Sequence, residues 1–157
     1  MSRSGADLAL LLLAGFRKMA DQGSIELAKL GYDDVRPVHD FALHSILSGA
    51  DSASALGRAM SITKQAAANT ISLLEDRGYV AREPDPTDKR RIRLSVTERG
   101  QAMLRDGEAV FDRLRERWEQ EAGGDAVAAL QDTLRQFVGP DAIQVNVPGW
   151  DARDPES

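Results

Sequence analysis

The sequence contains no cysteine, only two histidines, and few aromatic residues, which make up 5% of the 157 positions. The absence of cysteine excludes structural disulfides, thiolate metal sites and thiol-based redox sensing within this chain. The histidines, His39 and His44, are five positions apart, so they do not share a helix face at the usual spacing of three or four. No carboxylate cluster accompanies them. We therefore expect no metal site and no cofactor.

Long hydrophobic runs and common catalytic motifs are also absent. The longest apolar run, Leu8–Phe16, is far shorter than the ~20 residues of a membrane-spanning helix. There is no Gly-rich phosphate loop, no Gly-x-Ser-x-Gly elbow and no cluster of metal ligands. The hydrophobic content of 42% is typical of a globular chain with a real core. We expect a cytoplasmic protein that is not an enzyme and has no catalytic residues and no membrane partner.

The net charge of −5 at pH 7 argues at first against a nucleic-acid partner. The charge is unevenly distributed, however. Between Arg58 and Arg99, nine basic and six acidic residues leave a net charge of +3, so the remainder of the chain carries −8. An acidic body with one locally basic segment is typical of a DNA-binding protein whose other surfaces avoid nucleic acid.

Hydrophobic periodicity predicts a mainly helical chain. Helices, counted with their caps, are expected over about 6–29, 34–47, 52–60, 63–77, 97–121 and 125–138. The first helix has a wide apolar face, which includes Leu8, Leu12 and Phe16 and indicates burial on more than one side. For the tail after Pro140, the sequence leaves a pairing arm and a loose segment equally open.

A β-hairpin is expected between the fourth and fifth helices. Residues 79–82 read as a short strand, residues 83–88 are rich in turn formers, and residues 91–96 alternate between apolar and polar. In the second strand, Ile92, Leu94 and Val96 are expected to point to the same side. The predicted fold class is therefore mainly α with a small β-hairpin wing, a winged helix-turn-helix domain.

The fourth helix has the pattern of a DNA-recognition helix. A buried stripe is expected from Ala67, Thr70, Ile71 and Leu74. The opposite face is short and polar, as a helix that enters the major groove requires. Its candidate DNA-binding residues are Thr63, Lys64, Gln65, Ala68, Asn69 and Ser72. Taken alone, an amphipathic helix with a solvated face explains this pattern equally well.

The tip of the hairpin gathers cations that suit an anionic partner. Lys89, Arg90, Arg91 and Arg93 lie within five residues, and Asp88 is placed to orient the Arg90 guanidinium. Arginine fits a narrow minor groove, where the potential is most negative. A solvated loop with salt bridges to nearby aspartates is the alternative. A recognition helix followed by a basic wing, in this order, makes DNA binding the better interpretation.

The segment Ala53–Gly100, ASALGRAMSITKQAAANTISLLEDRGYVAREPDPTDKRRIRLSVTERG, resembles the MarR family of winged helix-turn-helix regulators. The resemblance is carried by Arg-Gly before a strand, Asp-Pro-x-Asp-x-Arg in the wing and Leu-x-x-Thr-x-x-Gly after it. It implies an obligate homodimer built from the first, fifth and sixth helices. It also implies that Arg90 is the wing-tip arginine and Asp88 the aspartate that orients it.

The resemblance further implies a transcriptional repressor that binds a near-palindromic operator in double-stranded DNA. Many such proteins lose DNA affinity when a small aromatic effector binds between the dimerisation and DNA-binding parts. For that effector we hypothesise a pocket lined by His39, Phe41, His44 and Trp118.

The predicted organisation has four parts. These are a dimerisation helix in residues 1–33, the winged helix-turn-helix domain in 34–100, dimerisation helices in 101–139 and a tail in 140–157. A winged-helix module that binds another protein instead of DNA remains the alternative function, because a fold does not fix a function. Four cations on the wing argue against that alternative.

Overall fold

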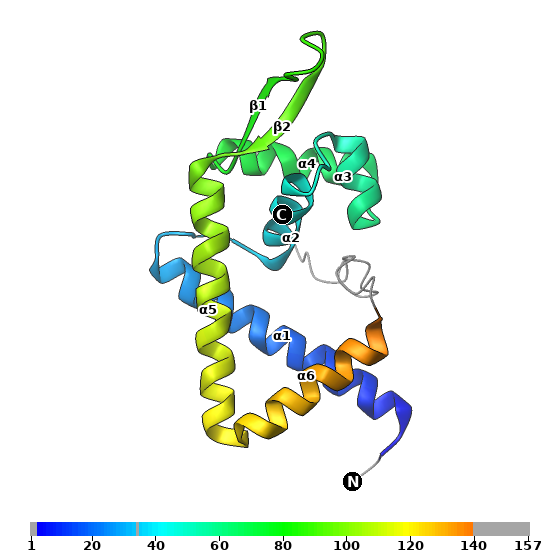
Figure 1. Cartoon of the computed structure of the whole chain (residues 1–157), viewed down its shortest axis with the longest axis vertical. Helices are drawn as coiled ribbons and strands as arrows, with labels where there is room; N and C mark the ends of the chain where they lie inside the picture. The colour runs from blue at the N-terminus through cyan, green and yellow to red at the C-terminus, as the bar shows by residue number, and fades with distance from the viewer. Residues whose placement is uncertain (1–2, 34, 140–157) are drawn as a thin grey trace. The chain divides into compact units, whose positions relative to one another are not determined.

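A computed structural model describes residues 3–33 and 35–139 of the chain. This part of the chain folds into helices and one two-stranded antiparallel hairpin (Figure 1), which confirms the predicted fold class. The elements in order are α1 (Gly5–Lys29), α2 (Pro37–Leu47), α3 (Ala53–Met60), α4 (Lys64–Asp76), β1 (Val80–Pro84), β2 (Ile92–Val96), α5 (Glu98–Ala122) and α6 (Gly124–Val138).

The chain divides into two compact units, and three of the helices contribute residues to both. Among the described residues, the terminal unit comprises 3–33, 35–40 and 102–132, and the central unit comprises 41–101 and 133–139. The predicted four-part division, with dimerisation at 1–33 and 101–139, stays a prediction. The predicted tail, 140–157, lies outside the described residues.

In the terminal unit, α1 and the turn that follows it contact α5 at individual residues. Gly23 on α1 is buried against the ring of Phe111, and a Cβ at this position would lie 2.7 Å from the ring Cζ atom. After α1 the chain turns through Gly31 (φ 92°), and buried Tyr32 donates a hydrogen bond to the Asp106 carboxylate at 2.6 Å. Gly23 is thus a position at which α1 and the Phe111 ring pack closely.

The second helix begins later than residue 34, where the sequence pattern placed it. Its first residue is Pro37, and the Arg36 carbonyl accepts from the amide groups of His39 and Asp40. A residue that precedes proline avoids the helical conformation, and proline itself suits the first helical position. The predicted start at Asp34, a residue outside the described part, was therefore too early.

The central unit combines α3, α4 and the hairpin. The side chains of Ser52 and Thr63 accept hydrogen bonds from the amides of Ala55 and Ala66, so both predicted N-caps are present. The apolar core of the unit includes Leu43, Leu56, Met60, Ala67, Ile71, Leu74, Tyr79 and Leu94. In Figure 1 the hairpin extends away from α3 and α4, so its tip projects from the helices of this unit.

Both strands of the hairpin differ slightly from their predicted bounds. The first begins at Val80 because the Tyr79 amide donates to the Leu74 carbonyl and so closes the end of α4. The register runs from Val80 opposite Val96 to Pro84 opposite Ile92. Leu94 and Val96 are buried as predicted, but Ile92 is 68% exposed. Of the three residues expected on the inward side of the second strand, only the two nearer the helices are therefore buried.

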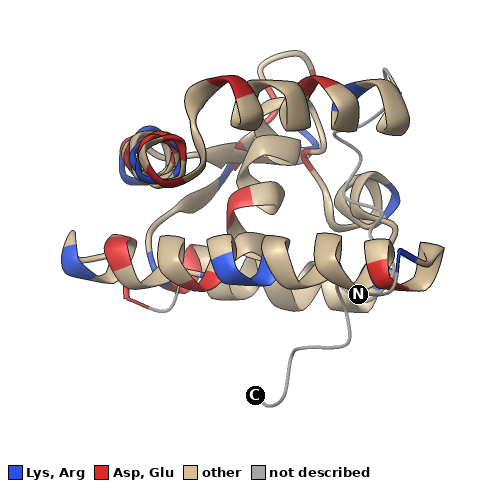
Figure 2. Ribbon diagram, turned by 90° about the horizontal axis from the view of Figure 1, so that it is seen from below, with Lys and Arg blue, Asp and Glu red and all other residues tan. Residues whose placement is uncertain are grey.

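The last two helices each have buried and exposed residues. Figure 2 shows α5 nearly end-on, with many acidic and basic residues around it, whereas Met103, Val110 and Leu114 of the same helix are buried. On α6, Val127 is buried, whereas Phe137 is 81% exposed. This helix begins at Gly124, directly after Gly123 (φ 95°) and slightly before its predicted start. Within residues 3–33 and 35–139, no helix is long and apolar enough to cross a membrane.

Candidate nucleic-acid interface

Helix α4 is held to the central unit by one face only. Ala67, Ile71 and Leu74 are essentially inaccessible to solvent. Thr70, expected in the same stripe, is half-buried, and its hydroxyl donates to the Ala66 carbonyl at 3.1 Å. Because this stripe fixes the helix from behind, the opposite face is presented outward.

The structure places the predicted recognition residues on that outward face. Thr63 caps the helix, Ala68 is half-buried, and the remaining four side chains are exposed: Lys64, Gln65, Asn69 and Ser72. The face combines one cation, two amides and a hydroxyl. Such groups suit phosphate oxygens and the donor and acceptor edges of base pairs.

Two of these side chains are bonded to each other. The Gln65 amide nitrogen donates to the Asn69 side-chain oxygen at 3.0 Å. Residues four apart lie on the same face of a helix, so the two amides form one continuous polar group. The bond uses one donor of Gln65 and leaves its carbonyl oxygen and the Asn69 amide nitrogen to meet a ligand. The spacing was visible in the sequence, but the bond was not.

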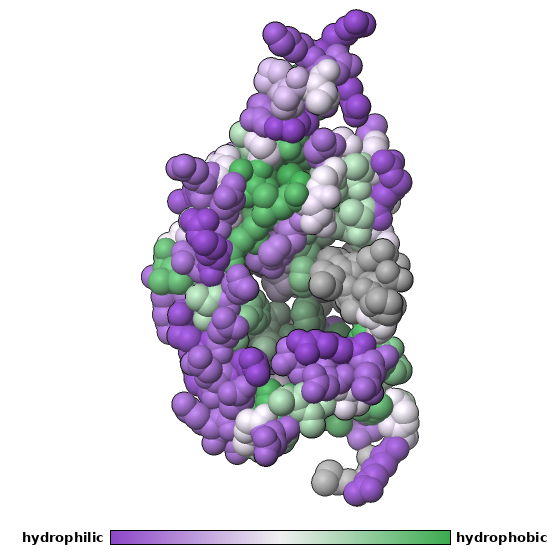
Figure 3. Space-filling view, in the orientation of Figure 1, coloured by the Kyte–Doolittle hydropathy of each residue, from purple (hydrophilic) through white to green (hydrophobic). Residues whose placement is uncertain are grey.

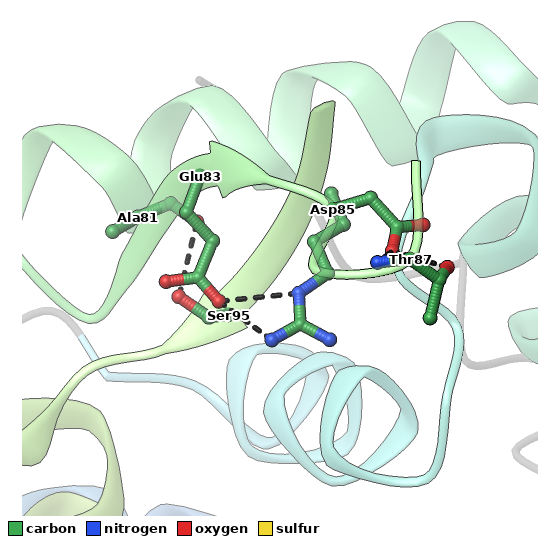
Figure 4. Close-up of polar contacts among 6 residues, drawn as sticks. Ala81, Glu83, Asp85, Thr87 and Ser95 are labelled. Atoms are coloured by element: carbon green, nitrogen blue, oxygen red, sulfur yellow. Dashed lines mark hydrogen bonds and ion pairs between the residues drawn. The ribbon is translucent and has the colours of Figure 1, made fainter. Parts of the chain in front are cut away.

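The turn between the strands is fixed by aspartate side chains bonded to the main chain. The Asp85 carboxylate accepts from the amide and the hydroxyl of Thr87, at 2.8 and 2.7 Å (Figure 4). These hydrogen bonds, with the amide bond first, lower the pKa of the Asp85 carboxyl below its usual value. Asp88 likewise accepts from the Arg90 amide at 3.1 Å. Asp88 therefore contacts Arg90 through the backbone, not through the predicted guanidinium contact.

The cations at the tip point to solvent. Lys89, Arg90 and Arg91 are all exposed, and Figure 3 shows the end of the hairpin as strongly hydrophilic. Within the described part of the chain, no carboxylate forms an ion pair with any of these three side chains. The salt bridges to nearby aspartates that the alternative of a solvated loop included are therefore not formed by these three side chains.

Arg93 differs from the other predicted wing residues. It lies opposite Glu83 in the strand register, and its guanidinium Nη2 and Nε donate to one Glu83 oxygen at 2.9 and 3.1 Å (Figure 4). Its positive charge is thus balanced within the hairpin. A carboxylate and a guanidinium directly opposite each other stabilise the strand pair, so Arg93 supports the wing.

A second ion pair was missed by sequence reasoning. Arg82 on β1 donates through Nε to the Glu75 carboxylate on α4 at 2.7 Å. This contact links the recognition helix to the first strand of the wing. Glu75 is near the end of α4 and Arg82 is seven positions later on β1, so no helical or strand spacing predicts that they pair. The pair becomes apparent only when α4 and β1 are seen to pack together.

The residues of the hypothesised effector pocket fall into both units. His39 is buried in the terminal unit, where its ring Nδ1 accepts from the Arg36 amide at 3.0 Å, and Trp118 on α5 is 41% exposed. Phe41 is half-buried and His44 is exposed on α2, both in the central unit. The pocket remains a hypothesis. Among the described residues, no group of three or more His, Asp or Glu side chains is arranged to hold a metal ion.

Comparison with known proteins identifies the segment that carries this interface. Residues 41–91 match the family model described as MarR family. This segment is similar to the MarR family. The MarR segment runs from α2 through α3, α4 and β1 to Arg91 at the tip of the wing, so it includes the exposed face of α4 and the three exposed cations. A search of curated proteins finds no match.

Many solved structures share the fold over most of the chain. One is a MarR-family transcriptional regulator from Rhodococcus sp. RHA1, with 22% identity, a TM-score of 0.64, and coverage of 88% of this chain and 98% of that one. Another is a mutant E. coli MarR complexed with operator DNA, with 23% identity, a TM-score of 0.64, and coverage of 85% of this chain and 94% of that one. A third is CouR from Rhodococcus jostii RHA1 bound to p-coumaroyl-CoA, with 22% identity, a TM-score of 0.62, and coverage of 88% of this chain and 97% of that one. They confirm the winged-helix fold of this chain. The match of residues 41–91 to the MarR family model supports DNA-binding regulation of transcription as its class of function.

Proposed function

We propose that this chain is a sequence-specific transcriptional regulator that binds double-stranded DNA as a homodimer. The observation that carries the proposal is the pairing, in one compact unit, of a polar outward face on α4 with an exposed cationic hairpin tip. The E. coli MarR structure with operator DNA has the same fold, which supports the proposal.

In the proposed complex α4 enters the major groove. Thr63 and Lys64 at its N-terminal end meet phosphate, and the bonded amides of Gln65 and Asn69 read base edges. Amide side chains pair with the N6 and N7 atoms of adenine, and the small Ala68 permits close approach or contact with a thymine methyl group. Ser72 continues the same face.

The wing is proposed to lie over the adjacent minor groove. Arg90 is at its tip, where the Asp88 carboxylate fixes the backbone amide of the arginine. Lys89 and Arg91 flank it and meet phosphates, which gives sequence-independent affinity that salt weakens. The ion pair between Arg82 and Glu75 holds the wing at a defined position relative to α4.

The proposed mode of regulation is repression that a small aromatic molecule relieves. CouR, which shares the fold, is bound to p-coumaroyl-CoA in its structure, and this supports a search among aromatic compounds. The hypothesised pocket residues, His39, Phe41, His44 and Trp118, provide rings that suit such a ligand. The operator of a twofold dimer is expected to be nearly palindromic, with half-sites about one helical turn, ~34 Å, apart.

The test is an anisotropy titration of labelled DNA from immediately upstream of the gene that encodes this chain. It is run at two salt concentrations, with random-sequence DNA as competitor. Tight binding that resists the competitor and weakens with salt supports the proposal. If binding never exceeds that of the competitor, the same titration is repeated on duplexes selected from random DNA. Failure there contradicts the proposed function.

A further inference from the structure

An apolar side chain stands exposed beside the cations of the wing. Ile92 is the first residue of β2, directly after Arg91, and 68% of its surface is accessible. Its partner in the strand register is Pro84, which is also exposed. Leu94 and Val96, on the same side of the strand, are buried, so Ile92 continues the inward face of the hairpin beyond the body of the unit.

The surroundings of Ile92 indicate what can cover it. Three exposed cations, Lys89, Arg90 and Arg91, immediately precede it in the chain. The residue after Ile92 is Arg93, whose charge is neutralised by Glu83. Ile92 therefore lies between three exposed cations and a cation that is already paired. An apolar protein surface would leave the cations unsolvated and unpaired. A polyanion with an apolar groove wall satisfies both kinds of side chain.

We infer that Ile92 is a specificity-determining residue that contacts the minor groove next to Arg90 and favours A·T over G·C base pairs there. This assignment rests on the proposed DNA binding of the wing. Proteins that bind the minor groove frequently insert apolar side chains, isoleucine among them, at base steps from that groove. The assignment extends base reading from α4 to the hairpin.

The preference follows from the chemistry of the groove floor. A·T pairs present only the adenine N3 and thymine O2 acceptors, whereas a G·C pair adds the guanine N2 amino group, a donor. Ile92 has no acceptor, so its side chain would remove water from that amino group and offer nothing in return. Leaving a buried donor unsatisfied disfavours binding, and A·T pairs impose no such cost.

The experiment uses the full chain and a duplex selected from random DNA, on which hydroxyl-radical footprinting locates the minor groove covered by the wing. Three versions of that segment are compared by anisotropy: A·T pairs, G·C pairs and inosine·C pairs. Inosine lacks the amino group, so I·C resembles A·T in the minor groove. The wild-type chain is expected to bind the G·C version about tenfold more weakly, a typical effect of one unfavourable base pair, and the I·C version like A·T.

Two substitutions assign the effect to Ile92. Ile92→Thr keeps a β-branched strand residue but adds a hydroxyl that accepts from the guanine amino group, so the tenfold difference should nearly disappear. Ile92→Val keeps an apolar side chain and should retain the difference. Circular dichroism checks that both variants remain folded.

The outcomes separate this assignment from the proposed function. If the wild type binds the three versions equally, or if Ile92→Thr discriminates like the wild type, the assignment to Ile92 is overturned while DNA binding stands. If the wild type enriches no duplex during selection, the proposed function itself fails, and the role of Ile92 fails with it.

Discussion

At the scale of single residues, Arg90 has the most direct predicted effect on affinity. Its side chain is exposed at the wing tip, and within the described residues it has no carboxylate partner. Arg90→Ala should therefore weaken binding to specific and random duplexes alike, and it should reduce the slope of log affinity against log salt by about 1. Anisotropy titrations at four salt concentrations measure both effects.

Arg113→Ala is the matched control for Arg90→Ala. Arg113 is likewise exposed but lies on α5 in the terminal unit, outside the proposed interface. Its removal should leave both the affinity and the salt slope near those of the wild type. The wing assignment is wrong if Arg90→Ala retains wild-type affinity at every salt concentration.

Gln65 and Asn69 should instead affect which sequences are bound. Removing either amide should lower discrimination between preferred and altered base pairs by about 1–3 kcal/mol, with little change in affinity for random DNA. Because the two side chains share a 3.0 Å hydrogen bond, the effects of Gln65→Ala and Asn69→Ala should not add. A double-mutant cycle on selected duplexes tests this coupling. Strict additivity would show that each amide acts alone.

Side-chain exposure at the interface was largely predictable from sequence, but side-chain pairing was not. The ~3.6-residue spacing of apolar residues in α4 correctly placed Lys64 and Asn69 outside the buried stripe. This spacing alone determines which residues share the apolar face of a helix. The pairing of Arg93 with Glu83 depends on the strand register, which the turn geometry sets. The exposure of Ile92 depends on how far the hairpin extends beyond the helices.

At the scale of elements, the junction between the hairpin and α5 is a tight point of the central unit. A Cβ at Gly100 would lie 2.4 Å from the Tyr79 carbonyl oxygen and 2.7 Å from a Val96 methyl carbon. The backbone oxygen cannot rotate away, so Gly100→Ala should destabilise the fold by about 1–3 kcal/mol. Urea unfolding followed by circular dichroism measures the change.

Gly107→Ala provides the comparison within the same helix. The nearest atom to a Cβ at Gly107 is an Asp40 carboxylate oxygen at 3.5 Å, an ordinary contact. This substitution should stabilise the chain by up to about 1 kcal/mol, because alanine favours a helix interior over glycine. Equal stability changes for the two variants would contradict the packing described at Gly100.

The predicted starts of helices are correct where the side chain of the N-cap residue bonds to a backbone amide. Ser52, Thr63 and Thr97 each accept a hydrogen bond from an amide three residues later, a local signal that the sequence displays directly. The starts of α2 and β1 were misplaced because other interactions compete there. The proline at position 37 delays the helix, and the Tyr79 amide closes α4 before the strand begins.

At the scale of the whole molecule, the exposed apolar side chains of α1 and α6 support the proposed homodimer. The large exposed hydrophobic side chains on these helices are Leu8, Leu10, Leu11, Leu12, Phe16, Ile25, Leu130, Phe137 and Val138. Exposed apolar surface of this extent marks an interaction site. Light scattering should therefore give twice the chain mass of 17.1 kDa.

Charges introduced on α1 should disrupt that assembly. The double variant Leu8→Glu/Leu11→Glu should lose the dimer mass, because two carboxylates would be buried without partners. Leu47→Glu, at an exposed apolar position on α2, should keep it. A monomeric wild type, or a double variant that stays dimeric, would contradict the proposal.

The organisation of the whole chain could not be derived from periodicity. Residues 3–33 and 35–40 join residues 102–132 in one unit, although residues 41–101 of the central unit separate them in sequence. Periodicity identifies helices but not which distant helices pack together, and the contact between Gly23 and Phe111 has no sequence signal. The family resemblance, carried by the wing motif, implied the winged-helix fold that the structure confirms.

Selection of random-sequence DNA by the full chain, followed by sequencing of the bound duplexes, tests whether the chain reads DNA as a dimer. A twofold dimer should enrich one near-palindromic motif with half-sites about one helical turn, ~34 Å, apart. The same selection with Arg90→Ala should yield this motif at lower affinity, whereas Gln65→Ala should yield a different one. If no motif is enriched, or if enriched sequences show no twofold symmetry, a dimeric DNA-reading regulator is contradicted.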